Sequence, residues 1–198
     1  MSVLHFERLD TSSPTERVAY ERAFYAAFRR AADNRLIRQL WQWDDEAHRV
    51  ATRIPYSDQA VFVLRDGGGH IVTGLAVNHA LRSFQSSAYG FFPPQTVDGC
   101  CEFLTVFSVH EYRLATRFKF WRDSFSALQT AGFHTGYATT APRVLNLHKL
   151  LGGRILKENT IENEVRYFLE FDLRVVNDAG TLSTPDPRVR NLGEAPGA

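Results

Sequence analysis

The sequence of 198 residues has little cysteine, almost no net charge and no long apolar run. Its two cysteines, Cys100 and Cys101, are neighbours, and a vicinal pair cannot join distant parts of a chain by a disulfide. We therefore expect a protein of a reducing compartment, the cytoplasm. Neither the cysteines nor the seven histidines show the spacing of a zinc site, so we expect no bound metal.

The charges nearly cancel, since 23 Lys and Arg residues face 22 Asp and Glu residues. This balance argues against a nucleic-acid partner, because binding to phosphates needs a clustered basic excess. No stretch approaches the roughly 18 apolar residues of a membrane-spanning helix. The N-terminal residues lack the basic start and apolar run of a signal peptide. We therefore expect no contact with a membrane.

The length and the 44% hydrophobic content are those of one globular domain. We assign residues 1–176 to this domain. From residue 177 onward Gly, Pro, Asp and Ser dominate, so we expect residues 177–198 to form a disordered tail.

Hydrophobic periodicity predicts both strands and helices along residues 3–173. An Asp-Gly-Gly-Gly stretch at 66–69 predicts a hairpin turn rather than a phosphate loop, because a strand follows it. The order of elements predicts an α/β fold with one mixed sheet flanked by helices. Strands are expected at 3–9, 60–65, 70–79, 100–109, 135–140, 154–157 and 165–173, and helices at 14–43 (interrupted near 32–34), 114–131 and 142–151.

Three stretches within this order of elements resemble the GCN5-related N-acetyltransferase (GNAT) superfamily, over residues 3–173. The hairpin 60–79 is similar to the second and third strands of that fold. The sequence Val-His-Glu-Tyr-Arg at 109–113 is similar to the strand-to-helix segment that opens the acyl-CoA site. The sequence Leu-His-Lys-Leu-Leu-Gly-Gly at 147–153 is similar to the helix that ends in Tyr-x-x-x-Gly-Phe.

The resemblance implies an N-acyltransferase that moves an acyl group from acyl-CoA, acetyl-CoA first of all, to the amine of a small molecule by direct attack. It also implies that the segment 113–118 binds the pyrophosphate of CoA at a helix N-terminus. The sequence departs from the family's glycine-rich pattern there, which changes the shape of the phosphate cradle. The expected binding residues in this segment are Arg113, Ala115, Thr116, Arg117 and Phe118.

Two other interpretations stay open. Acyl-homoserine-lactone synthases and N-acyl amino acid synthases also lack the clean glycine loop and use acyl carrier protein as donor. The stretch 41–45 and Glu102 are loosely similar to that branch, and the aromatic loop 80–99 would then help to line an apolar pocket, or act as a lid. The missing glycines are equally compatible with a non-catalytic binding module. The sequence leaves open whether the protein forms a homodimer.

Acyl transfer to an amine needs a base for the amine and an acid for the leaving thiol. Glu102, in an apolar strand that would raise its pKa, is the candidate base, although a carboxylate paired with arginine fits equally. His148 stands where the resembled family carries the tyrosine that protonates the thiol. A histidine on an apolar helix face is also a common packing residue.

Backbone N–H groups near the end of the central strand are expected to polarise the thioester and hold the pantetheine arm, as the resemblance implies. Asn146 is expected to bond the donor from the last helix. The run Ser-Val-His-Glu at 108–111 cannot form a catalytic triad, because neighbours on one strand end lack the relay geometry. The expected N–H donors are those of Phe107, Ser108 and Val109.

Overall fold

The computed structural model describes residues 3–31, 34–94 and 98–174, so the predicted tail lies outside the described residues. Its elements, in chain order, are β1 (His5–Arg8), α1 (Pro14–Phe28), η1 (Arg29–Ala31), α2 (Arg35–Leu40), β2 (Trp41–Asp44), β3 (Arg49–Thr52), η2 (Tyr56–Asp58), β4 (Gln59–Arg65), β5 (Ile71–Asn78), η3 (Gln85–Tyr89), β6 (Cys100–Ser108), α3 (Leu114–Thr130), β7 (Thr135–Thr140), α4 (Pro142–Leu150), β8 (Arg154–Ile161) and β9 (Glu164–Asp172).

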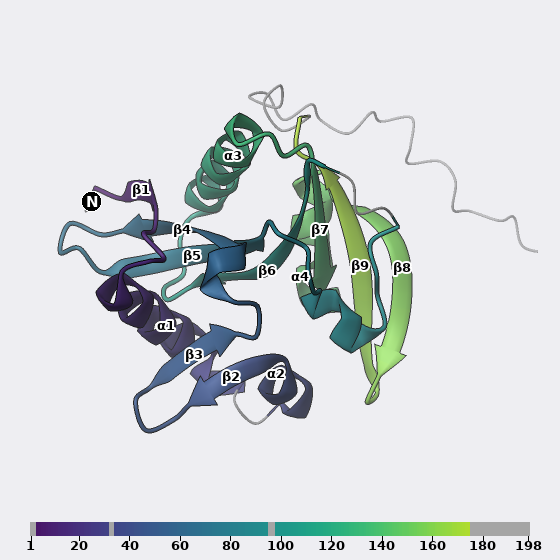
Figure 1. Cartoon of the computed structure of the whole chain (residues 1–198), viewed down its shortest axis with the longest axis horizontal. Coiled ribbons are helices and arrows are strands. Elements are labelled where there is room, and N and C mark those ends of the chain that lie inside the picture. Colours follow the sequence, from purple (N-terminus) through teal and green to yellow (C-terminus); the bar gives the residue numbers. More distant parts are fainter. Residues whose placement is uncertain (1–2, 32–33, 95–97, 175–198) are drawn as a thin grey trace, which may run out of the picture.

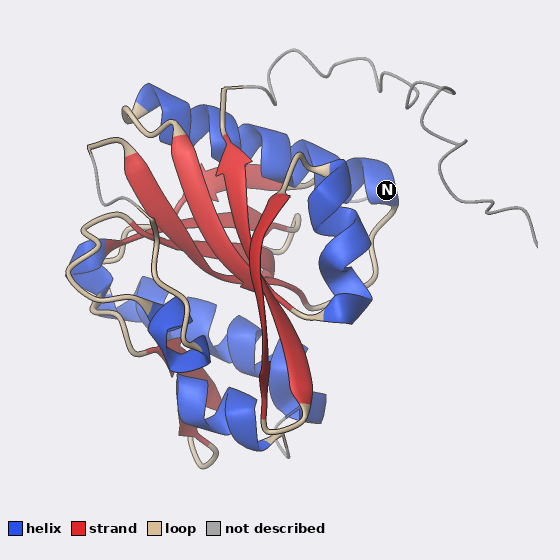
Figure 2. Ribbon diagram, turned by 90° about the vertical axis from the view of Figure 1, so that its right-hand side faces the viewer, coloured by secondary structure: helices blue, strands red, loops and turns tan. Residues whose placement is uncertain are grey.

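Seven strands form the main sheet, in the order β1-β4-β5-β6-β7-β9-β8. Neighbouring strands are antiparallel except β6 and β7, which are parallel. Helices cover both faces of the sheet (Figure 2). The predicted α/β fold with a mixed sheet is therefore confirmed.

The sheet opens between β6 and β7. Their pairing begins at Cys100 with Thr135 and stops at Phe103 with Ala138. Beyond that point β6 continues to Ser108 beside β5, while β7 continues beside β9. Figure 1 shows the group β7, β9 and β8 turning away from β4, β5 and β6. Among the described residues, no strand pairs with the edge that β6 exposes after Phe103.

A bulge in β6 lies next to the point where the two strands part. Val77 of β5 is opposite Phe103, whereas the preceding residue of β5 is opposite Thr105, so Leu104 is an extra residue. The insertion changes which side chains face which side of the sheet. Phe103 packs into the core under α3, and Phe107, four residues later, packs into the core under α1.

The α1 core and the α3 core are both rich in aromatic rings. Under α1, the ring of Phe24 is stacked on that of Phe107, with centroids 5.4 Å apart. Under α3, the ring of Phe125 is stacked on that of Phe103, also at 5.4 Å. The β6 strand therefore anchors both layers of helices, and it fixes where the gap between β6 and β7 opens.

Two segments differ from the prediction. Residues 41–44 form β2, which pairs with β3, instead of the end of a helix. Trp41 packs under α1 while Gln42 is exposed, so side chains alternate between the two faces as in a strand, although the apolar spacing of the sequence also fits the end of a helix. The predicted loop 80–99 contains the short η3 helix, and its buried Tyr89 lines the inner cavity described below, whereas Phe92 is exposed.

No helix in the described residues has the length and apolarity that crossing a membrane would require. Within the same residues, no group of three or more His, Cys, Asp or Glu side chains is placed so that it could bind a metal ion.

Candidate functional site

A cavity of about 540 Å³ lies where the end of β6 meets the first turns of α3. We call it the outer cavity. Its wall combines backbone from the unpaired part of β6 with polar side chains from the helix. It is lined by residues 106–112, by Thr116, Arg117, Phe120 and Trp121 of α3, and by Arg143, Val144 and Leu147 of α4, among others.

A second cavity of about 230 Å³, the inner cavity, occupies the gap between β6 and β7. Its walls are mostly apolar, with residues 103–106 on one side and residues 138–140 on the other. Six residues line both cavities, so the two adjoin. The shared residues are Phe28, Val106, Trp121, Arg143, Val144 and Leu147.

A third depression, of about 550 Å³, adjoins the inner cavity on another side. It lies among α2, the start of α4 and the start of β9, and it has three arginines in its wall: Arg30, Arg143 and Arg166. Ile37, Ala141 and two of these arginines also line the inner cavity. The gap between β6 and β7 is thus reached from two directions, one at the start of α3 and one beside α2.

The backbone of β6 presents N–H groups to this gap. Val109 donates its N–H to the carbonyl of Val72 on β5, at 2.9 Å. Because such bonds alternate along an antiparallel pair, the N–H of Phe107 also faces β5, while those of Val106 and Ser108 face the opposite edge. Of the three N–H groups predicted from the sequence, the one at Ser108 is therefore directed to the open side.

Glu102 is buried on β6 beneath the η3 segment. Its carboxylate accepts hydrogen bonds from the backbone N–H of Ser86 at 2.7 Å and of Gln85 at 3.1 Å, and from Nδ2 of Asn78 at 3.2 Å. Burial raises its pKa, and these hydrogen bonds oppose that rise. Glu102 lines neither the outer nor the inner cavity. The visible role of the carboxylate is to anchor the loop.

His148 lines the inner cavity from α4 and is 7% exposed. Its ring meets the edges of Trp121 and Phe171, each with centroids 6.0 Å apart. Burial lowers the pKa of His148 to about 4, so the ring is uncharged at neutral pH. Its Nδ1 atom is buried and has no hydrogen-bond partner among the described residues. An uncharged imidazole is a weak proton donor, so the lowered pKa disfavours the acid role predicted for His148. That role stays a prediction.

No protein-family model matches the sequence, and no curated protein matches it. The fold, however, matches solved structures. The CoA-dependent acyl-homoserine lactone synthase BjaI, with SAM and isopentyl-CoA, is 15% identical, with 90% of this chain and 89% of that chain covered and a TM-score of 0.66. The synthase LasI is 9% identical, with 92% and 97% covered and a TM-score of 0.66. FeeM, an N-acyl amino acid synthase from uncultured soil microbes, is 11% identical, with 90% and 95% covered and a TM-score of 0.58.

The chain has the GNAT fold. The segment predicted from the sequence to bind a pyrophosphate is the start of α3. Arg113 is the N-cap residue and its side chain makes no capping bond. Thr116 and Arg117 line the outer cavity, while Ala115 is exposed. Phe118, which was expected to bind there, packs against the α3 core and lines neither the outer nor the inner cavity, because its large apolar ring is partly buried among the core side chains. Asn146 is exposed and lines neither the outer nor the inner cavity.

Sequence reasoning missed several residues that the fold brings to the gap. Trp121 lines both cavities, although its helical spacing in the sequence is that of an ordinary core residue. Arg143 belongs to both cavities and to the third depression, and its only sequence signal is a basic residue in the first turn of a helix. Arg117 carries a buried Nε atom with no hydrogen-bond partner among the described residues. That orphaned donor beside a cavity is a further reason to expect an anionic ligand at the start of α3.

Proposed function

We propose that this protein is an acyltransferase that moves an acyl group from an acyl thioester to the amine of a small molecule. The observation that carries the proposal is the run of adjoining cavities through the gap between β6 and β7. A transfer between two substrates needs a donor and an acceptor to meet at one point, and here two approaches meet in one apolar space. The solved structures with the same fold include acyl-homoserine lactone synthases and an N-acyl amino acid synthase.

The outer cavity is the proposed donor site. The first turn of α3 presents the positive end of the helix dipole, which favours phosphate oxygens, while the N–H groups of Thr116 and Arg117 donate to the carbonyl of Arg113. Arg117 and Thr116 line the cavity there, with Arg113 at the N-cap. These residues fit the pyrophosphate of CoA. They fit equally the phosphopantetheine of an acyl carrier protein, which is the alternative donor.

The inner cavity is the proposed site of the acyl group. Its volume of about 230 Å³ far exceeds the space that the methyl group of an acetyl donor needs. A water molecule takes about 30 Å³ of the liquid, so the space is that of several waters. Apolar walls such as Leu40, Leu104 and Leu147 favour a hydrocarbon chain there. We therefore place a longer acyl chain ahead of acetyl, in contrast to the first expectation from the sequence.

The proposed reaction is a direct attack. The amine nitrogen forms a bond to the thioester carbon, and negative charge develops on the carbonyl oxygen. The carbon–sulfur bond then breaks, and the proton lost by the amine passes to the departing sulfur, which leaves as a thiol. N–H groups on the open edge of β6, at Val106 and Ser108, are oriented to stabilise the developing oxyanion. Arg30 and Arg143 of the third depression would bind an anionic group on the acceptor, such as the carboxylate of an amino acid, whereas Arg166 there is paired with Glu164.

The experiment combines ligand binding with transfer. Purified protein is mixed with CoA, acetyl-CoA and octanoyl-CoA, and its unfolding temperature is measured. A ligand at 100 times its dissociation constant contributes about 2.7 kcal/mol, so the temperature should rise by a few degrees. Arg117→Gln should lower the affinity for all three ligands about tenfold, through loss of a charge-assisted hydrogen bond. Arg122→Gln, on the exposed face of α3, should not.

Thiol release from octanoyl-CoA is then followed in the presence of amino acids. Release that depends on the amine confirms transfer. A protein that binds the donor but releases no thiol with any amine would be a binding module, as the missing glycines first suggested. No binding of any CoA ligand would leave the carrier protein as the donor to be tested in the same assay.

A further inference from the structure

The side-chain amide of Gln85 joins two walls of the inner cavity. Its Oε1 accepts a hydrogen bond from Nε1 of Trp41 at 3.1 Å, and its Nε2 donates to the carbonyl oxygen of Leu104 at 2.5 Å. The indole N–H can only donate and the carbonyl can only accept, so the orientation of the amide is fixed by its partners. Asp, Glu, Ser or Thr could not satisfy both partners from this position in the same way.

Both partners of Gln85 are placed where they shape the cavity. Trp41 and Leu104 line it directly, whereas Gln85 stands behind them. Leu104 is the extra residue of the bulge, next to the last pair between β6 and β7. The ring of Trp41 meets Phe24 and Phe28 edge-on, each with centroids 4.7 Å apart. The Gln85 bridge therefore ties an aromatic wall to the point where the strands part.

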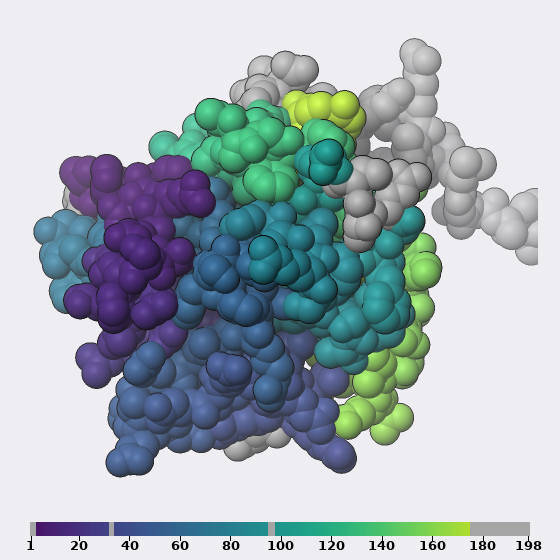
Figure 3. All heavy atoms as spheres, in the orientation of Figure 1, coloured from purple at the N-terminus to yellow at the C-terminus, as the bar shows by residue number. Residues whose placement is uncertain are grey.

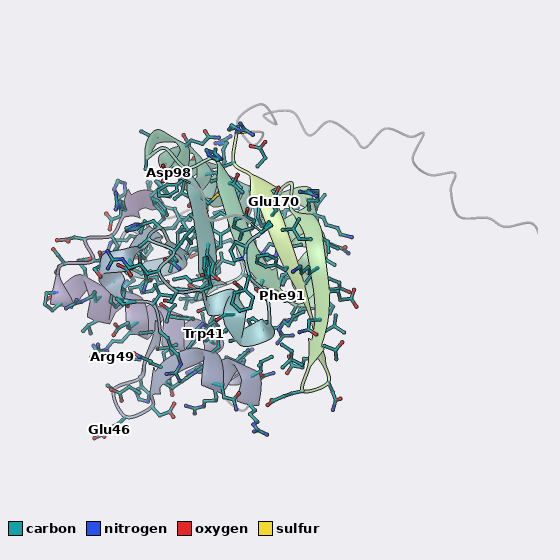
Figure 4. The ribbon with its side chains drawn as sticks, turned by 45° about the vertical axis from the view of Figure 1, so that its right-hand side comes forward. Trp41, Glu46, Arg49, Phe91, Asp98 and Glu170 are labelled. Atoms are coloured by element: carbon teal, nitrogen blue, oxygen red, sulfur yellow. The ribbon has the colours of Figure 1, made fainter. Side chains whose placement is uncertain are left out.

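Gln85 is itself held in place by the loop that carries it. Its backbone N–H and that of Ser86 donate to the buried carboxylate of Glu102. In Figure 3, the teal atoms of the segment that contains η3 cover the middle of one face of the molecule. Figure 4 shows Trp41 and Phe91 in the interior near this turn, whereas Glu46 is at the outer end of the β2–β3 hairpin. The amide is thus a fixed strut between the loop, β2 and β6.

We propose that Gln85 is a specificity-determining residue, which positions Trp41 and Leu104 so that the inner cavity ends at a set depth. This inference rests on the proposed function, because it takes the cavity as the acyl site. Without the bridge, the indole of Trp41 can turn and the bulge can relax. The cavity then admits a longer chain and holds the preferred chain less closely. CoA and acetyl-CoA do not reach this wall, so their binding does not depend on Gln85.

The experiment measures the dissociation constants of CoA and of acetyl-, hexanoyl-, octanoyl-, decanoyl- and dodecanoyl-CoA by calorimetry. Gln85→Met removes both hydrogen bonds at nearly constant size, and Gln85→Glu keeps the acceptor for Trp41 but loses the donor to Leu104. Ser87→Ala is the control in the same turn, because the Ser87 hydroxyl donates to the carbonyl of Phe84, within the turn itself, and not to a wall of the cavity. Each buried methylene changes affinity about fourfold, so a preference that moves by one two-carbon step changes the affinity ratio about 16-fold.

We expect Gln85→Met to move the preferred chain to a greater length while the affinities for CoA and acetyl-CoA stay within about twofold of the wild type, a margin of roughly 0.4 kcal/mol. A parallel loss for all ligands, or an unchanged preference, overturns the role of Gln85 and leaves the proposed function standing. Absence of acyl-CoA binding by the wild type is a different result, because it removes the proposed donor and this inference together.

A second measurement reports on the bridge itself. The chain has three tryptophans, so an amide spectrum of the ¹⁵N-labelled protein shows three indole resonances. Gln85→Met should move the Trp41 resonance most, since its N–H loses its partner. If all three indole resonances shift equally, or if the Trp41 resonance does not move, Gln85 does not hold the Trp41 indole by a hydrogen bond.

Discussion

The two halves of β6 are both extended strand, but they differ in the strands with which they pair. The first half, Cys100–Phe103, pairs with β7, and the second half, Leu104–Ser108, leaves β7 and keeps only β5. Where β6 is paired with β7, both edges of its backbone are hydrogen-bonded within the sheet, while side chains of both halves, such as Phe103 and Phe107, pack in the core. Where it is unpaired, its outer N–H groups face a cavity. The difference shows that the candidate site forms where β6 and β7 stop pairing.

The largest expected effect comes from the core beneath the paired half. Phe125 is fully buried, and its ring is stacked on Phe103. Phe125→Ala should lower the free energy of unfolding by about 3–5 kcal/mol, through lost burial and a residual cavity. Urea unfolding measures this change.

The exposed Phe92 gives the matched control, because Phe92→Ala removes the same ring from the surface, where it is 58% exposed. Its effect should stay within about 0.5 kcal/mol. If the Phe125→Ala protein were as stable as the Phe92→Ala protein, packing against the paired half of β6 would not stabilise the fold.

The sequence predicted most of this sheet, because strands such as β4 and β6 are short, mostly apolar runs and the Gly turn marks the hairpin of β4 and β5. It could not predict where β6 and β7 part, since that depends on the bulge at Leu104, and Leu104 looks like its apolar neighbours. It located the start of α3, where Arg117 lines the outer cavity.

The sequence could not assign Gln85 a role. A polar residue in a loop carries no pattern, and its two partners, Trp41 and Leu104, are 44 and 19 residues away. The apolar strand around Glu102 correctly predicted a buried carboxylate. Its partners are backbone N–H groups of a loop, which the side-chain pattern of a sequence does not reveal.

The next effect concerns His148, which faces the unpaired half across the inner cavity. Burial lowers its pKa from 6.5 to about 4 in the folded protein. Between these values the unfolded chain binds more protons, so the stability that the neutral ring contributes is complete above pH 6.5 and is lost as the pH falls towards 4. The linkage amounts to about 3 kcal/mol at most.

His148→Leu removes this titration, so its stability should fall less steeply between pH 6.5 and 4 than that of the wild type. Chemical unfolding at several pH values measures the difference. Asn146→Leu, on the same helix, is the control and should keep the wild-type slope. Equal slopes for all three proteins would mean that His148 is not held neutral by its surroundings.

The smallest change in stability, and the sharpest question about the two halves, concerns Glu102. It lies on the paired half, yet its carboxylate holds Gln85, which reaches Leu104 on the unpaired half. Glu102→Gln leaves one oxygen to accept bonds and turns an NH₂ group toward N–H donors. The free energy of unfolding should fall by about 1–3 kcal/mol. Glu170→Gln, which removes a partly exposed carboxylate of β9 that pairs with Arg154, should cost less than about 1 kcal/mol.

The pH dependence of the transfer rate distinguishes two roles of Glu102, an anchor for the loop and a base for the amine. If Glu102 accepts the amine proton, activity rises with pH through its raised pKa, and Glu102→Gln abolishes that limb of the profile. If it anchors the loop, Glu102→Gln lowers the rate at every pH and keeps the shape of the profile. It should then also alter the acyl-chain preference in the same direction as Gln85→Met, because both variants release the same strut. The geometry favours the second outcome, since the carboxylate faces three donors and lines neither the outer nor the inner cavity.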